Sequence, residues 1–257
     1  GTLTTACNPI NWYSRASGSV SDPIWSLTPA GIPGAAVFSN YTSIVVQADH
    51  NIVQDVPSPV TRRLVVQSSG SYDVGSNTID LLADLEVEGS LNASSGDVRM
   101  VGGIKQLITA SDLLTVRNIA LDNPAGLDLM AALNITGTLA LDQGEFTTNE
   151  NTVRLVSNAS GTARLGPVGA SASMNGNLFV ERYIPAGTTN WRLLASPVQN
   201  RNINNWQDDF ITAGFPGSHY PKEGSWAMYD EGKVLVAGGG IDTTERPDDG
   251  TIGISTN

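Results

Sequence analysis

Short runs of alternating apolar and polar residues recur along the middle of the chain, and their spacing limits the folds that it can adopt. The runs include 63–67 (RLVVQ), 84–89 (DLEVEG), 132–142 (ALNITGTLALD) and 151–157 (NTVRLVS). Strict alternation is typical of β-strands with one buried face and one solvent-facing face. Clusters of Gly, Asn, Ser and Asp separate the runs and predict turns. We therefore expect an all-β fold of short strands.

Two of these stretches read almost alike: LEVEGSLNASSG from Leu85 and LNITGTLALDQG from Leu133, 48 residues apart (133 − 85). Leu64 precedes Leu85 by 21 residues (85 − 64), and Val153 follows Leu133 by 20 (153 − 133). A recurrence of about 20–24 residues indicates a solenoid, in which each turn stacks on the one before by parallel pairing. Because one turn cannot bury its own apolar face, we expect ladders of Leu, Ile and Val inside the stack. On this interpretation, the second phrase returns to the corner of the first, two turns later.

Composition marks the ends of this block. Pro124 is the only proline between Val60 and Gly166, and no tryptophan lies between Trp25 and Trp191. The sequence therefore predicts an N-terminal cap segment over 1–35, a parallel β-helix over 36–176 and a smaller, β-rich and β-sandwich-like domain over 177–257. An antiparallel β-sandwich is the competing fold for the middle block, but its strands need not recur in register with the same glycine offset.

The chain ends at GTIGISTN, a strand-like pattern with no closing turn, so we expect the C-terminal domain to be truncated and to continue beyond this point. Cys7 is the single cysteine, which excludes a disulfide within this sequence. We interpret it as a small buried or terminal thiol, with a bridge to another chain as the alternative.

The net charge limits the classes of binding partner that we expect. The formal charge is −11, and only 15% of residues are charged, while Ser, Thr, Asn and Gly are abundant. A chain this acidic repels phosphate backbones, so we expect no nucleic acid as a partner. No stretch is long and apolar enough to predict direct membrane insertion. The balance is typical of a secreted β protein with polar turns.

Three stretches resemble parts of a known group of proteins. Residues 179–198 (FVERYIPAGTTNWRLLASPV) resemble a phrase common in large secreted surface proteins of the Bacteroidota, which are exported by the type IX secretion system. Residues 13–26 (YSRASGSVSDPIWS) and 31–37 (GIPGAAV) resemble the start of such domains, with Val20 where the family usually has Trp. Residues 100–123 (MVGGIKQLITASDLLTVRNIALDN) resemble one of their coils.

The resemblance implies a right-handed parallel β-helix followed by a β-rich domain, in an extracellular or surface-bound protein. Many such proteins are described as adhesins. Asp242-Thr243-Thr244 is similar to the short O-glycosylation signal of these exported proteins, which makes Thr243 a candidate glycosylation site.

Parallel β-helices often cleave polysaccharides, so carboxylates on the coil are candidate catalytic or cation-binding groups. Leu85 and Val87 are expected to face inward, which places Asp84, Glu86 and Glu88 outward on one line, about 7 Å apart. No acids recur at the equivalent places of the second phrase, and we interpret the three as a solvated acidic face. The two histidines, His50 and His219, have no neighbouring nucleophile motif.

The C-terminal region carries the other candidate residues. Trp191, Trp206 and Trp226 are candidates for stacking on sugar rings, with a place in the core of that domain as the alternative. Asp248 and Asp249, in RPDDG, are candidate Ca²⁺ ligands, with a simple turn as the alternative.

These observations predict a non-enzymatic extracellular surface protein, structural or adhesive, with no catalytic residues and no cofactor unless it is Ca²⁺. Its expected partners are further copies of itself, in filaments or a surface layer, or surface glycans. We expect a C-terminal cap, because the last coil would otherwise expose an open edge. The alternatives are a carbohydrate-binding module and a β-helix polysaccharide lyase or hydrolase.

Overall fold

The computed structural model describes residues 9–57, 59–183, 228–229 and 241–242, and this part of the chain is all-β, with no helix. The chain divides into two units, 1–187 and 188–257. In the second unit, β22 (Met228–Tyr229) pairs antiparallel with β23 (Ile241–Asp242). The rest of the predicted β-sandwich-like domain that falls in this unit lies outside the described residues.

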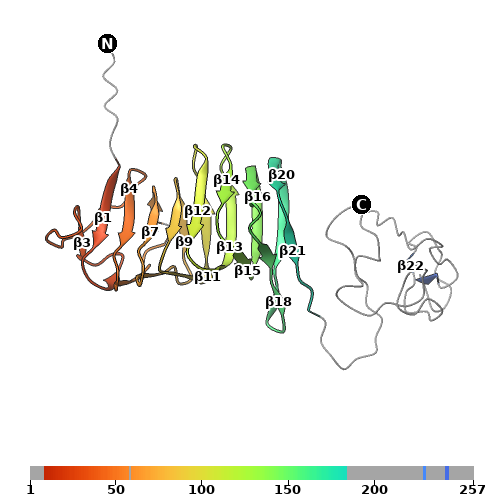
Figure 1. Cartoon of the computed structure of the whole chain (residues 1–257), viewed down its shortest axis with the longest axis horizontal. Helices are drawn as coiled ribbons and strands as arrows, with labels where there is room; N and C mark the ends of the chain where they lie inside the picture. Colours follow the sequence, from red (N-terminus) through yellow and green to blue (C-terminus); the bar gives the residue numbers. More distant parts are fainter. Residues whose placement is uncertain (1–8, 58, 184–227, 230–240, 243–257) are drawn as a thin grey trace, which may run out of the picture. The chain divides into compact units, whose positions relative to one another are not determined.

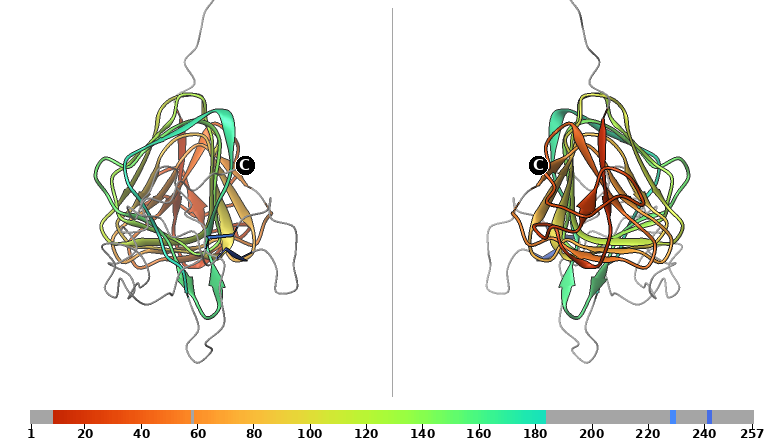
Figure 2. Two further views of the ribbon diagram at one scale, coloured as in Figure 1. Left: turned by 90° about the vertical axis from the view of Figure 1, so that its right-hand side faces the viewer. Right: turned by 90° about the vertical axis from the view of Figure 1, so that its left-hand side faces the viewer.

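The first unit is a β-solenoid of about 6 turns, in which strands stack by parallel pairing (Figure 1). Viewed along the stack, each turn has three sides (Figure 2), which we name faces 1, 2 and 3. Face 1 contains β1 (Ile10–Ser14), β4 (Thr42–Val46), β7 (Leu64–Val66), β10 (Leu85–Val87), β12 (Gln106–Ala110), β14 (Leu127–Leu129), and the ends of β16 (Thr138–Thr147) and β20 (Arg164–Asn175).

Faces 2 and 3 complete each turn, and the longer strands bend from one face to the next. Face 2 contains β2 (Gly18–Ser19), β5 (Asn51–Val53), β8 (Ser71–Asp73), the starts of β11 (Ser90–Met100) and β13 (Leu114–Asp122), β15 (Leu133–Ile135), β17 (Val153–Leu155) and β21 (Leu178–Val180). Face 3 contains β6 (Val60–Thr61), β9 (Thr78–Leu81), the ends of β11 and β13, and the starts of β16 and β20.

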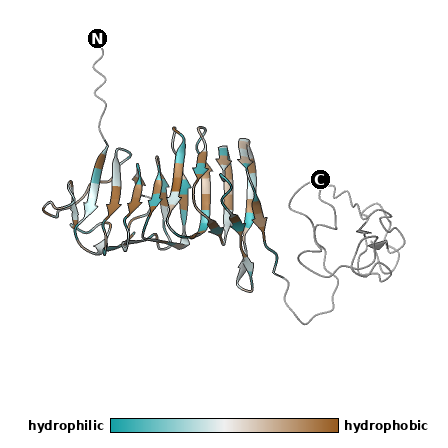
Figure 3. Ribbon diagram, in the orientation of Figure 1, coloured by the Kyte–Doolittle hydropathy of each residue, from teal (hydrophilic) through white to brown (hydrophobic). Residues whose placement is uncertain are grey.

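Aliphatic ladders fill the inside of the stack, as the alternating pattern predicts. On face 1, Leu64 pairs with Leu85, and on face 2, Val153 pairs with Leu133. These side chains are buried, whereas the residues between them point outward, so hydropathy alternates along the strands (Figure 3). The predicted parallel solenoid and both of its single-turn spacings are confirmed.

The predicted stacking of the two similar phrases is wrong. Leu85 begins β10 on face 1, whereas Leu133 begins β15 on face 2. The residues that stack on Leu85 are Leu64 and Ile108. The two phrases therefore lie at different corners of the coil.

A shared steric requirement explains why the phrases look alike. Each runs from a strand into a glycine at a corner, Gly89 or Gly137. A Cβ added to Gly89 would lie 2.2 Å from the carbonyl oxygen of Gly70 in the turn below, and one added to Gly137 would lie 2.8 Å from that of Arg117. Contacts this short exclude a side chain. The shared sequence pattern thus indicates a corner where two turns approach closely, but it does not identify which corner of the coil this is.

The solenoid extends past both of the bounds expected from composition. β1 pairs with β4, and β2 with β5, so residues of the predicted 1–35 segment belong to the ladders. At the other end, β21 pairs with β17 beyond residue 176. The ladders therefore run from Ile10 to Val180.

Three further strands of the described first unit lie outside the three faces. β3 (Trp25–Ser26) runs antiparallel to β1 at the N-terminal end of the stack. β18 (Ser157–Asn158) and β19 (Gly161–Thr162) form a hairpin that projects from the last turns (Figure 2). Both break the regular coil, and both lie at its ends.

Buried amides close the corner between faces 3 and 1. The Gln106 side-chain amide donates to the carbonyl oxygens of Leu81 (2.9 Å) and Ala83 (2.6 Å) in the previous turn. Its Oε1 accepts from the Asn123 side chain of the next turn at 2.9 Å. These bonds pair side-chain amides with corner carbonyls inside the stack, where unpaired polar groups would be costly to bury.

Candidate functional site

Most of the candidate residues that the sequence singles out lie outside the described residues. This holds for the predicted sugar-stacking tryptophans, the predicted Ca²⁺ ligands, the predicted glycosylation site and the single cysteine. They are Trp191, Trp206, Trp226, Asp248, Asp249, Thr243 and Cys7. The glycan-binding, Ca²⁺-binding and glycosylation hypotheses stay predictions.

The predicted outward acids of β10 are described, and two of the three contact neighbouring turns. Glu86 forms an ion pair with Arg63, which precedes β7 in the turn below. Asp84 Oδ1 accepts from the backbone N–H of Leu107 in the turn above at 2.9 Å. Glu88 is exposed. Across the residues that the structure describes, no three acidic, His or Cys side chains gather where they could hold a metal ion. The contacts of Asp84 and Glu86 tie turns together.

The same kind of contact recurs along the outer surface. Arg99 pairs with Asp80 at 3.1 Å, and Asn118 donates to Asp97 at 2.6 Å, each across one turn. Further links join Gln143 to Asp122 and Lys105 to Asp128, at 2.6 and 2.8 Å. Many of the chain's acids therefore form polar contacts that link neighbouring turns. Exposed contacts of this kind contribute about 0–1 kcal/mol each to the stability of the fold.

A serine–histidine pair was not visible in the sequence, because its members lie 36 residues apart. Ser14 Oγ and His50 Nδ1 are 2.8 Å apart. Ser14 Oγ also accepts the backbone N–H of Gln47 at 2.9 Å, so the hydroxyl can donate to the ring nitrogen. However, Ser14 is 0% exposed. A nucleophile must reach its substrate, so this pair joins two turns rather than forming a catalytic centre.

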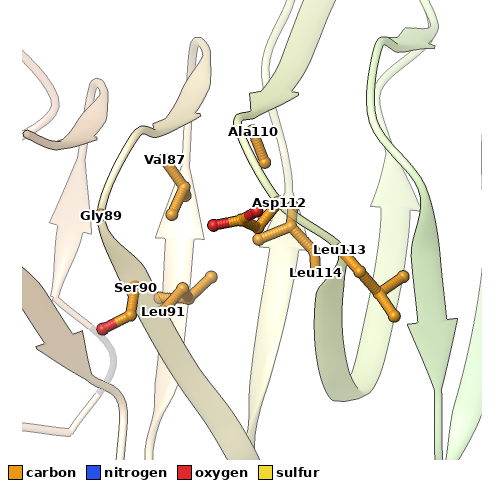
Figure 4. A pocket seen from close by; sticks show the side chains of 8 residues that line it. All are labelled: Val87, Gly89, Ser90, Leu91, Ala110, Asp112, Leu113 and Leu114. Atoms are coloured by element: carbon orange, nitrogen blue, oxygen red, sulfur yellow. The ribbon is translucent and has the colours of Figure 1, made fainter. Parts of the chain in front are cut away.

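A small cavity opens at the corner between faces 1 and 2, with a volume of about 150 Å³ (Figure 4). It arises where the ladder of Val66 and Val87 continues, in the next turn, with the smaller side chain of Ala110. Asp112 lines it, beside otherwise mainly apolar side chains. Pockets for drug-sized ligands measure about 300–1,000 Å³, so this hollow is too small for a polysaccharide segment.

The N-terminal end of the stack is closed by the chain itself. Trp25, on β3, is 0% exposed and lies across the first turn. Its ring meets Phe38 edge-to-face at 5.2 Å, and its indole N–H donates to the Val20 carbonyl at 3.0 Å. The antiparallel strand β3 also pairs with the outer edge of β1 at Tyr13 and Ser14.

The C-terminal end of the stack is open within the part of the chain that the structure describes. There, β20 pairs only with β16, and β21 only with β17. The core-facing side chains of this last turn are 40–50% exposed at Leu165, Val168 and Val180, whereas their ladder partners one turn earlier are buried. We call this surface the open end and define it by Leu165, Val168, Met174, Leu178 and Val180. It is the described surface best suited to binding other β structure.

An ion pair fastens the last strand beside the open end. Glu181 accepts from the Arg154 guanidinium at 2.7 Å and from the backbone N–H of Ser157 at 3.0 Å. The Ser157 N–H and then Arg154 hold the pKa of Glu181 below its ordinary value of 4.5. Arg154 also lies over the Phe179 ring, 5.9 Å from its centre.

We expect acid to loosen this last turn. Because the pKa of Glu181 is lower in the folded state, its stabilising contribution is present above the ordinary value and is lost as pH falls through the folded-state pKa. Hydrogen exchange should show reduced protection of β21 between about pH 6 and pH 3, beyond the general effect of acid. In Glu181→Gln this additional loss should disappear, whereas in Glu88→Gln, at an exposed position, it should persist. Equal acid sensitivity of β21 in all three proteins would contradict the assignment.

The pairing pattern defines the class of this unit: a three-sided parallel β-solenoid with one closed end and one open end. Comparisons with protein-family profiles, curated proteins and solved structures find no match to the chain. The resemblance to type IX-exported surface proteins of the Bacteroidota therefore stays a prediction. The described residues include no helix that is long and apolar enough to cross a membrane.

Proposed function

We propose that this chain is a non-enzymatic extracellular surface protein, structural or adhesive, whose solenoid serves as a rigid body. Support for rigidity comes from the continuous aliphatic ladders inside the stack and from the polar contacts that link neighbouring turns outside it. We further infer that the coil is right-handed, because parallel strands are joined by right-handed connections in about 98% of cases.

The observation that carries the proposal is the difference between the two ends. Within the described residues, Trp25 and β3 close the first turn, whereas the last turn presents half-exposed core residues and unpaired strand edges. Stacked turns need a polar terminal turn or a partner to be soluble. The open end therefore favours association as part of the protein's role. It also favours addition at one end over an open filament, which would require a free edge at both ends.

Protease treatment of intact producing cells tests the location. An extracellular surface protein is degraded from outside while a cytoplasmic marker stays intact, and we expect this result. Negative-stain images of the native protein, with and without Ca²⁺, then test the structural role. Short rods joined in defined assemblies would support it. Protein that is protected until the cells are lysed would overturn the proposed location.

A further inference from the structure

The strand edge at the open end is long and nearly free of charge. β20 spans 12 residues, RLGPVGASASMN, and Arg164 is its only charged residue. Natural proteins protect edge strands by keeping them short or by placing lysine and proline on them. Here Pro167 is the only proline and there is no lysine. Such an edge offers backbone N–H and C=O groups to a further strand.

The side chains beside this edge are those of an interrupted core. Leu165 stacks on Leu139, and Val168 on Leu141, and in both pairs the earlier residue is buried while the later one is exposed. A surface that continues such ladders must bring aliphatic side chains at the same spacing. Another turn of the same solenoid has this property.

The open end carries little net charge. The whole chain has a formal charge of −11. Residues 164–183 contain Arg164, Arg182 and Glu181 and no other charged residue, which gives +1 (2 − 1). Like-charged molecules repel less where the local charge is small or opposite. Two copies therefore meet little electrostatic repulsion at this end.

The closed N-terminal end determines how a second copy can add. β3 already pairs with the outer edge of β1 at Tyr13 and Ser14, and Trp25 covers the core beneath it. The free strand edges at the N-terminal end are short, since β2 and β6 span two residues each, whereas β20 spans 12, so the second copy offers its own open end. Two identical surfaces in contact are related by a two-fold axis, and the contact is closed. With that axis perpendicular to the stack, the strands of the two copies run antiparallel.

We propose that two copies of this chain pair tail to tail through their open ends, with β20 and β21 of each at the interface. This pairing rests on the proposed structural role and specifies the partner. It predicts a dimer that stops growing, rather than a filament. The dimer buries Leu165, Val168 and Val180, which are exposed in the single chain.

Analytical ultracentrifugation of the whole 257-residue chain tests the pairing. We expect a species of twice the 27.0 kDa chain mass that dissociates on dilution. Leu165→Lys combined with Val168→Lys should raise the dissociation constant about tenfold or more, because it places like charges across the interface. Ser173→Lys, an exposed residue that points outward from β20, should weaken pairing while leaving the core side chains unchanged. Ser111→Lys with Thr115→Lys adds two charges at exposed positions away from the open end and should leave the constant unchanged.

A monomer at every concentration would overturn the pairing, as would a dimer that persists in the Leu165/Val168 and Ser173 variants. If the chain is a monomer and the Leu165/Val168 variant also has a lower melting temperature, residues 184–257 of the same chain would be assigned as the cover of this end. That result would equally overturn the pairing. A monomer that protease treatment places outside the cell would overturn the pairing and leave the proposed location intact.

Discussion

Gly144→Ala is expected to destabilise the solenoid by about 2–6 kcal/mol. Gly144 lies where β16 bends from face 3 to face 1, with φ of +87°, and a Cβ added there would lie 1.9 Å from the Asn123 carbonyl oxygen. Backbone strain for a non-glycine residue costs about 1–3 kcal/mol. Displacing a neighbouring backbone costs about 1–3 kcal/mol more. Urea unfolding followed by far-UV circular dichroism measures the loss as a lower midpoint.

Gly103→Ala is the matched control for this prediction. A Cβ added to Gly103 meets nothing within 4 Å, and its φ lies outside the left-handed region. A surface substitution of this kind changes stability by about 0.5 kcal/mol or less. If both variants unfolded at the midpoint of the wild-type chain, the close approach of turns at Gly144 would be refuted.

The alternation and the spacing were sufficient to predict the solenoid, because both follow directly from its geometry. A side chain that faces the core recurs every second residue along a strand and once per turn along the chain. Leu64 with Leu85 and Leu133 with Val153 satisfy both conditions, and they pair as predicted. The register of neighbouring turns is therefore readable from sequence.

The assignment of a phrase to a corner could not be read in the same way. Close approach of two turns occurs at more than one corner of the three-sided coil, so Gly89 and Gly137 occur in similar phrases on different faces. Local sequence gives the kind of corner but not its position in the turn. Counting strands between the phrases would have been necessary, and short strands are difficult to count across polar turns.

The open end escaped sequence reasoning for a related reason. Residues 164–175 contain Gly166, Pro167 and Gly169 and lack strict alternation, so they are typical of a loop rather than a strand. The long pairing with β16 gives them strand geometry. Exposure of Leu165 and Val168 then depends on what lies above the last turn, which no local pattern records.

The buried contacts that join distant residues were equally inaccessible. Ser14 with His50, and Trp25 with Phe38, come together because of how the first turns wrap. The outward direction of the acids of β10, in contrast, could be placed from sequence, but the contacts of Asp84 and Glu86 with neighbouring turns differ from the expected solvated acidic face.

Phe146→Ala is expected to destabilise the chain by about 3–5 kcal/mol, the range for truncating a buried aromatic residue. Phe146 is fully buried between Leu127 of the previous turn and Met174 of the open end. In a solenoid each turn contacts only its neighbours, so the loss should fall on the last turns first. Hydrogen exchange should show reduced protection of β20 and β21 while β4, β7 and β10 keep theirs.

Phe146→Leu provides the matched control, because it keeps an apolar side chain in the ladder and leaves a smaller cavity; its loss should be clearly less than that of alanine. A uniform loss of protection from β4 to β21 would mean that the solenoid unfolds as one cooperative unit. In that case the last turn could not loosen independently of the first, and binding at the open end would stabilise the whole stack rather than its final turns. The expected local response instead makes the open end the part of the molecule that a partner stabilises most directly.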